Sequence, residues 1–155
     1  MTILIAHRGN IKGPNPKVEN NPSYIETALS AGFEAEIDVW LTTAGFMLGH
    51  DEPMHLIGRE WIEERKDKLW CHAKNVEALI PLLERGIHCF WHQEDDVTLT
   101  NRGWLWTYPG KFLTPKSIAV MPEMLNCDVN PKAGADWLFG QVCAGICTDF
   151  VDRLK

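Results

Sequence analysis

The sequence has too few basic residues for a protein that binds nucleic acid. Its 15 lysines and arginines are outnumbered by 21 aspartates and glutamates, which gives a net charge of −6. A protein that holds a polyanion needs a basic face to neutralise the phosphates. We therefore expect no nucleic-acid partner, although this balance leaves room for a local basic pocket that holds one phosphate group.

Long apolar runs and paired cysteines are missing as well. No segment approaches the about 20 apolar residues that cross a bilayer, and the opening MTILIAHRG lacks the charged region of a signal peptide. The five cysteines include no CxxC pair, which is typical of reduced thiols. We expect a cytoplasmic protein without a membrane span. A zinc site at His88, Cys89 and His92 is a weaker alternative, because no second spaced pair accompanies it.

The pattern of apolar runs predicts one α/β domain over residues 1–155, and it indicates no oligomeric state. The expected strands are 3–7, 33–41, 46–49, 69–73, 88–92, 104–108, 117–121 and 145–149, and the expected helices are 22–31, 58–66, 76–85 and about 132–143. Strands that alternate with helices favour a parallel sheet. A full barrel typically takes about 250 residues. We therefore expect a TIM-type (β/α)8 barrel that is shortened or distorted, with helices missing near 93–103 and 109–116.

Two acidic residues on one expected strand suggest a metal site. Glu36 and Asp38 are two positions apart, so their side chains point to the same face of the strand. Their apolar neighbours Ala35, Ile37 and Val39 indicate a buried strand, although a solvated strand face is the alternative. Two buried carboxylates repel each other unless a cation accompanies them. Oxygen ligands of this kind suit Mg²⁺ or Ca²⁺.

Histidines follow two of the apolar runs. His7 ends the first run and His50 follows the run at 46–49. A histidine side chain, whose ordinary pKa is about 6.5, can give or take a proton near neutral pH. Arg8 and Lys74 supply cations that suit phosphate oxygens. These residue types together favour phosphate-transfer chemistry.

The same residues lie in short motifs with a fixed order. They are AHRG at 6–9, ENN at 19–21, AEIDV at 35–39, GHDE at 49–52, HAKN at 72–75 and GICTDFVDRL at 145–154. A single triplet within these motifs, such as HRG or HDE, occurs by chance in many proteins. The ordered set resembles the glycerophosphodiester phosphodiesterase family. The resemblance runs from Ile3 to Leu154 and is dense over 3–52 and 145–154.

The resemblance implies a hydrolase that cuts a small phosphodiester to a phosphomonoester and an alcohol. In that family one histidine activates a substrate hydroxyl and another protonates the leaving alkoxide, roles that fall here on His7 and His50. Arg8, Lys74 and Glu19 correspond to substrate-binding positions. We expect Asp51 to orient His50 by accepting from its second ring nitrogen.

The resemblance also implies a divalent metal cofactor, with Glu36 and Asp38 as ligands. The family's third ligand is an acidic residue two positions before a lysine, and this chain has His72 at that place before Lys74. His72 can ligate the metal, contact phosphate or pack in the core. Mg²⁺ is the expected ion, with Ca²⁺ and Mn²⁺ as alternatives, and an imidazole ligand shifts preference toward softer ions.

Two functions remain open at this point. The first is the metal-dependent phosphodiesterase, and the second is a non-catalytic or weakly active relative that binds a phosphate or phosphodiester. His92, Glu123 and Asp149 also end expected strands and are further candidates to line the pocket. The seven tryptophans favour core packing, although one of them could form the floor of a substrate pocket.

Overall fold

The central strands form where the sequence is apolar over four to nine residues. The computed structural model describes residues 2–126, 128–130 and 132–155. Strands β1 (Ile3–His7), β2 (Glu34–Thr42), β5 (Leu69–Ala73), β9 (Ser117–Val120) and β10 (Gly145–Thr148) have buried residues at consecutive positions. Burial of both faces is the usual condition of parallel strands. These strands therefore form the middle of the sheet.

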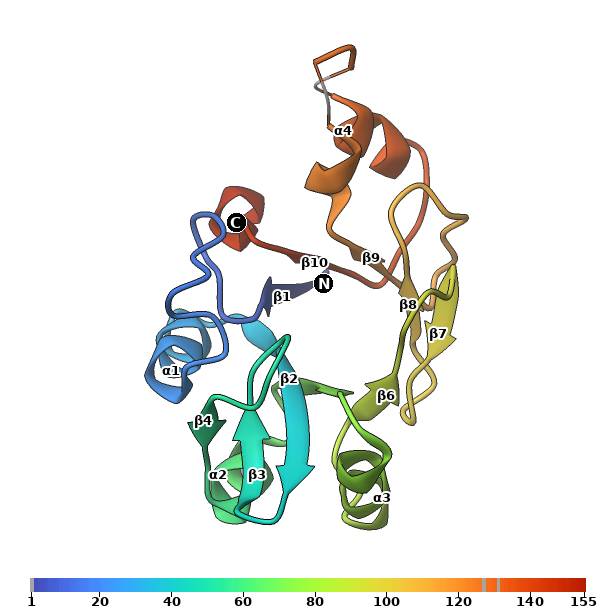
Figure 1. Ribbon diagram of the computed structural model, residues 1–155. Coiled ribbons are helices and arrows are strands. Elements are labelled where there is room, and N and C mark those ends of the chain that lie inside the picture. The colour runs from blue at the N-terminus through green and yellow to red at the C-terminus, as the bar shows by residue number, and fades with distance from the viewer. Residues whose placement is uncertain (1, 127, 131) are drawn as a thin grey trace.

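The sheet is mixed, and it curls without closing (Figure 1). Its parallel part runs in the order β6 (Cys89–Trp91), β5, β2, β1, β10, β9, β8 (Leu105–Thr107). Strands β3 (Gly45–Leu48), β4 (His55–Leu56) and β7 (Val97–Leu99) pair antiparallel to their neighbours. No ladder joins β6 to β7 or β8 within the described residues. The result is a half-barrel.

The helices begin and end at recognisable signals. Helix α1 (Pro22–Ser30) starts after Asn21, whose side chain accepts a hydrogen bond from Ser23 N, and α3 (Val76–Glu84) starts after Asn75 in the same way. The remaining helices are α2 (Arg59–Arg65), α4 (Ala133–Leu138) and the 3-10 helices η1 (Pro122–Leu125) and η2 (Val151–Leu154). None of the helices in the described ranges has the length and apolar character needed to cross a membrane.

The expected (β/α)8 barrel is wrong. The described residues hold four α-helices, and three strands run antiparallel. The chain turns back on itself at 42–45 and again at 99–105, where short hairpins replace the crossover helices that parallel strands require. The expected helix at 132–143 also ends early, at Leu138. The chain is thus too short, and its connections too tight, to surround the sheet with helices.

Aromatic residues fill the interior of the half-barrel below the carboxyl ends of its strands. Trp106 lies between Trp70 and Phe90, with ring centroids 5.8 Å and 4.7 Å away. Ile5, Ile118, Val120 and Cys147 complete the buried part of this cluster. A second, larger cluster packs the outer face of β2 and β5 against α2 and α3. The inner cluster gives the polar site above it a rigid apolar floor.

Candidate active site

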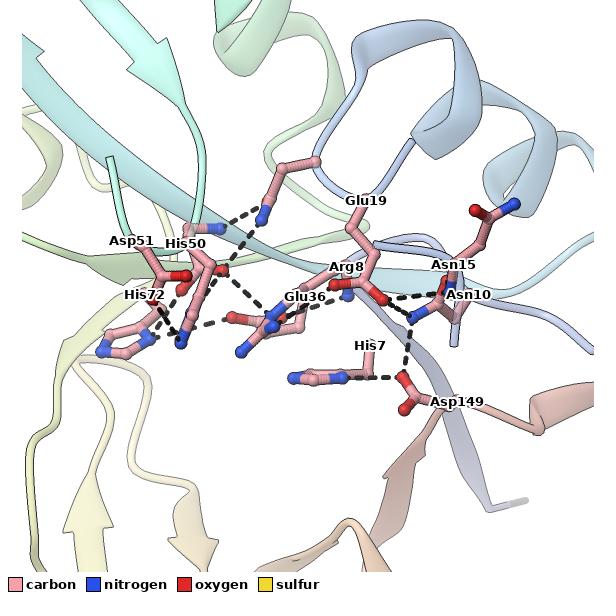
Figure 2. A network of polar contacts seen from close by, with 12 residues as sticks. His7, Arg8, Asn10, Asn15, Glu19, Glu36, His50, Asp51, His72 and Asp149 are labelled. Carbon is pink, nitrogen blue, oxygen red and sulfur yellow. Dashed lines mark hydrogen bonds and ion pairs between the residues drawn. The ribbon is translucent and has the colours of Figure 1, made fainter. Parts of the chain in front are cut away.

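The predicted site residues meet at one end of the sheet (Figure 2). Parallel pairing sets His7 opposite Glu36 and Asp38 opposite His72. A cavity of about 450 Å³ opens above these strands. Of the eight residues predicted from the sequence, those that line it are His7, Arg8, Glu19, Glu36, Asp38, His50 and His72. The eighth, Lys74, reaches the same cluster, with its Nζ 3.6 Å from Asp38 Oδ1.

Asp38 is the centre of this cluster. Its Oδ2 accepts a hydrogen bond of 2.9 Å from Asn20 Nδ2, interacts with His50 Nδ1 at 3.2 Å, and lies 3.2 Å from Arg8 Nε. Burial by itself would raise the pKa of Asp38, but the close contacts with His50 and His72 and the charge of Arg8 hold that pKa well below its usual range. The carboxylate is therefore ionised, and it fixes residues from three separate segments.

Glu36, Asp38 and His72 lie close enough together to hold one cation. Their potential ligand atoms lie within 4.8 Å of one another. His72 Nε2 donates a hydrogen bond of 3.0 Å to the carbonyl oxygen of His92, which can only accept. In the neutral ring, Nδ1 is then a bare lone pair, and it lies 3.1 Å from Asp38 Oδ1 and 3.9 Å from Glu36 Oε1.

Such an arrangement is unfavourable unless a positive charge lies close to these atoms, and Lys74 Nζ, 3.6 Å from Asp38 Oδ1, is one such charge. Asp38 Oδ1 is buried and makes no hydrogen bond. Burial and the negative charge of the neighbouring Asp38 raise the pKa of Glu36. The crowding of negative charge in the cluster is the cause of this shift as well. A divalent cation with one nitrogen and two oxygen ligands would satisfy the arrangement, and a proton on His72 Nδ1 is the alternative. The backbone carbonyl behind His72 is the partner that metal-binding histidines commonly have. The residues therefore fit a metal ion.

His7 is held by a carboxylate that the sequence analysis treated only as a secondary candidate. His7 Nδ1 donates to Asp149 Oδ1 at 2.8 Å, and Asn10 Nδ2 donates to the same oxygen at 2.8 Å. Burial would lower the pKa of His7, but the hydrogen bond to Asp149 raises it above its ordinary value. Glu123 Oε1 in turn accepts from Asp149 N and Thr148 Oγ1, both at 2.8 Å. His7 Nε2 remains available for proton transfer at the cavity.

His50 is oriented by Asp38 and not by Asp51. Its Nδ1 contacts Asp38 at 3.2 Å, whereas Asp51 lies 3.7 Å from Nε2 and leaves 94% of its side chain exposed. The backbone before His50 requires glycine, because Gly49 has φ of +155° and an added Cβ would lie 2.0 Å from Glu52 O. Asp51 lies beside the expected second ring nitrogen but makes no hydrogen bond to it, so the closer contact that orients His50 is with Asp38.

Arg8 is held over the carboxylates by a strained backbone. Its φ is 51°, a left-handed conformation that is uncommon for a residue with a long side chain. The Arg8 backbone N–H donates to Glu36 Oε2 at 3.2 Å, and its Nη1 donates to Glu19 Oε2 at 3.3 Å. Asn20 is also left-handed, with φ of 60°, and its N–H donates to Arg8 O. Glu19 is thus a residue that positions the guanidinium.

The opposite side of the cavity is apolar, and sequence reasoning did not find it. We call this side the apolar wall, and its residues are Trp106, Tyr108, Pro109, Val120, Met121 and Met124. Pro14 and Pro16, from the loop after β1, also line the cavity. His92, a candidate in the sequence, lies at the boundary between the polar cluster and the wall, with its ring 4.5 Å from that of Tyr108. The cavity therefore offers a charged half and an apolar half.

Comparison of the chain with protein-family models, with curated proteins and with solved structures finds no match. The resemblance to glycerophosphodiester phosphodiesterases therefore depends on the ordered motifs alone. The structure adds that those motifs, separated by up to 142 residues in the chain, converge on one cavity. The membership of the family stays a prediction.

Proposed function

We propose that the protein is a metal-dependent phosphodiester hydrolase that cleaves a glycerophosphodiester-type substrate to a phosphomonoester and an alcohol. The observation that carries this proposal is the meeting of two histidines in one cavity, each with Nδ1 held by a buried carboxylate. A ring held in this way keeps its orientation and presents Nε2 for proton transfer. Arg8 and Glu36 lie between the two rings in Figure 2.

The residues support a two-step reaction. The Arg8 guanidinium would bind two phosphate oxygens and Lys74 a third, which holds the phosphorus between His7 and His50. One imidazole takes the proton of a substrate hydroxyl as its oxygen bonds to phosphorus, and the other gives a proton to the alkoxide that leaves. Water then adds to the cyclic diester, the ring opens, and the two imidazoles return to their first protonation states.

Glu36, Asp38 and His72 would hold the cation in this proposal. When bound, the cation would polarise a phosphate oxygen and offset the negative charge that develops on it. Mg²⁺ suits the two carboxylates, and Ca²⁺ and Mn²⁺ are alternatives. Without a cation, an anionic substrate in this cavity would lie close to three carboxylates, those of Glu19, Glu36 and Asp38.

The test is a panel of glycerophosphodiesters assayed with EDTA and then with Mg²⁺, Ca²⁺ or Mn²⁺. We expect turnover that depends on the metal and that falls by at least about 10²-fold in His7→Ala and in His50→Ala. His55→Ala is the matched control, because His55 lies on β4 and does not line the cavity. Turnover near that of the unmodified protein in either variant would remove that histidine from the mechanism.

A non-catalytic phosphate-binding protein is the second candidate. It is favoured by the chemistry at position 72, where an imidazole stands in place of a third carboxylate and weakens a site for a hard cation. Such a protein would bind a phosphodiester in the same cavity and release it unchanged. Binding of a glycerophosphodiester without turnover under any of the metal conditions would favour it.

We further propose a small-molecule substrate in the cytoplasm. The cavity of about 450 Å³ has the size of a small-ligand site. The thiols of Cys71, Cys89, Cys143 and Cys147 are free, which suits a reducing compartment. Detection of the protein together with a cytosolic marker after cell fractionation would test the second point.

A further inference from the structure

The two halves of the cavity differ in the elements that supply them. Its ionisable lining residues come from β1, β2, β5 and the loops after β1, β3, β6 and β10, whereas β8, β9, η1 and the loops beside them supply the apolar and aromatic residues of the wall. Glu123 belongs to η1, but its Oε1 turns to Thr148 and Asp149 and its side chain does not line the cavity. One side of a bound phosphodiester would therefore face charges, and the other side would face hydrocarbon and aromatic rings.

Two residues of the apolar wall, Trp106 and Met121, are held in place by the surrounding structure. Trp106 is 4% exposed and packs into the aromatic cluster under the cavity. Met121 has φ of 46°, and its backbone N–H donates to Cys147 O at 2.7 Å. Among the described non-glycine residues, Arg8, Asn20 and Met121 have positive φ. Arg8 and Asn20 belong to the polar cluster around Asp38. Strain of this kind persists where the surrounding structure imposes it, and it gathers at functional sites.

His92 gives the wall one polar group that has no partner. Its side chain is 7% exposed, it lines the cavity, and neither ring nitrogen makes a hydrogen bond. The nearest charged atom, Asp95 Oδ2, is 3.5 Å from Nδ1. A buried imidazole without hydrogen bonds costs stability unless a ligand or water completes it. The wall is thus a mainly apolar surface, and His92 adds ring nitrogens without hydrogen bonds at its edge.

The order of the strands places this surface on the His7 side of the site. Strands β8, β9, β10 and β1 are consecutive neighbours, so the wall adjoins the His7–Asp149 pair. His50 lies beyond β2 on the opposite side, after β3. A group that occupies the wall is therefore next to the phosphate subsite and on the side of His7.

We propose that the apolar wall is a subsite for an aromatic alcohol of the substrate, so that the protein selects phosphate esters of flat apolar groups over esters of small polar ones. This inference rests on the proposed phosphodiester chemistry of the same cavity and adds the class of the alcohol to it. Trp106 and Tyr108 supply aromatic contacts, and Met121 and Met124 supply thioethers that pack well against rings.

The test compares the binding of phenyl phosphate and methyl phosphate to the full chain by calorimetry in the presence of Mg²⁺. These probes share the phosphate and differ only in the group that would contact the wall. We expect phenyl phosphate to bind at least about tenfold more tightly, because the ring would remove apolar surface from water. Met121→Gln and Met124→Gln keep the length of the side chain and should each reduce that preference by about threefold or more.

Ile80→Gln is the matched control, because Ile80 is an exposed apolar residue on α3, outside the cavity. It should leave the preference unchanged. Met124 is 66% exposed, so Met124→Gln should fold normally even if the strained position 121 does not accept glutamine. Equal affinity for the two probes, or a preference that both methionine variants retain in full, would overturn the proposal.

Hydrolysis is measured separately, on glycerophosphodiesters of phenol and of ethanol. A phenyl preference in binding with no hydrolysis of either diester would keep the subsite and refute the hydrolase. Hydrolysis of both diesters at equal kcat/KM, with equal binding of the two probes, would keep the hydrolase and refute the subsite. No binding of either probe would refute the subsite.

Discussion

The clearest perturbation of this site is His72→Glu. The variant places a carboxylate where two buried carboxylates already converge, and it removes the hydrogen bond from His72 Nε2 to His92 O. If His72 is a metal ligand, the variant has an all-oxygen cluster of three carboxylates. We then expect stronger binding of Mg²⁺ and weaker binding of Mn²⁺ relative to Mg²⁺, because a hard cation gains more from a carboxylate than from an imidazole.

The cost of the change without metal can be bounded from the distances. His72 Nδ1 lies 3.1 Å from Asp38 Oδ1 and 3.9 Å from Glu36 Oε1. Two like charges at about 4 Å repel by roughly 4 kcal/mol at an effective dielectric constant near 20, and protonation of one carboxyl relieves part of this. A net loss of about 1–3 kcal/mol corresponds to a melting temperature lower by about 2–12 °C for a chain of this size.

Metal should reverse that loss in the variant. An ion at about 100 times its dissociation constant stabilises the folded state by about 2.7 kcal/mol, which is comparable to the expected cost. The assay is the melting temperature as a function of Mg²⁺ and Mn²⁺ concentration, starting from EDTA. His72→Phe is the matched control, because it keeps the ring that stacks on Phe90, with centroids 5.3 Å apart and planes 7° apart, and it removes both nitrogens.

The outcomes separate a ligand from a packing residue. A ligand predicts that His72→Glu melts lower in EDTA and recovers with Mg²⁺, while His72→Phe loses most of the response to metal that the unmodified protein has. If His72 only packs, or only pairs with the carboxylates as an imidazolium, the glutamate variant melts lower and metal does not restore it. That result would refute the assignment of His72 to the metal site.

Two other predictions follow from groups that the structure places. Asp149→Asn should lower turnover by about 10²-fold or more and shift the His7 limb of the pH–rate profile to lower pH, because the asparagine no longer favours the imidazolium; an unchanged profile would contradict this positioning role. His88 is buried, and burial lowers its pKa to about 4. As the pH falls, this histidine is protonated near pH 6.5 in the unfolded chain but only near pH 4 in the folded chain. Stability should therefore fall as the pH decreases from 6.5 to 4, by up to about 3 kcal/mol, and His88→Gln should flatten the dependence of melting temperature on pH over that window.

The sequence located most of the strands but not their closure. Each expected strand has a counterpart in the structure, because a short apolar run between breakers is a local signal. Closure depends on edge strands, for which the sequence offers no comparable signal. At the edge of β6 the Asn101 side chain donates to Ile87 O and accepts from Cys89 N. A side chain thus takes the place that a neighbouring strand would have in a closed barrel.

The partners of the two histidines show the limit of reasoning from neighbours in the chain. Asp51 follows His50 directly, yet the hairpin of β2 and β3 brings Asp38 to its ring from twelve residues away. Asp149 was visible as a residue after the last strand, but its role required the pairing of β1 with β10, which joins the two ends of the chain. Residue types were therefore predictable, and their pairing followed only from the topology.

A phosphate site of this kind does not need a closed barrel. The candidate residues depend on one continuous ladder, β5–β2–β1–β10, whose registers set Asp38 beside His72 and His7 beside Glu36. The open side of the sheet, between β6 and β7, lies at the far end of this ladder from β1, and His92, which follows β6 there, lies at the boundary of the charged half. Loss of outer helices removes cover from the sheet, but it changes neither the parallel pairing nor the direction in which strand ends point. The chemistry that the motifs indicate is therefore compatible with a half-barrel. The effect of metal on variants at position 72 tests whether that chemistry includes a bound cation.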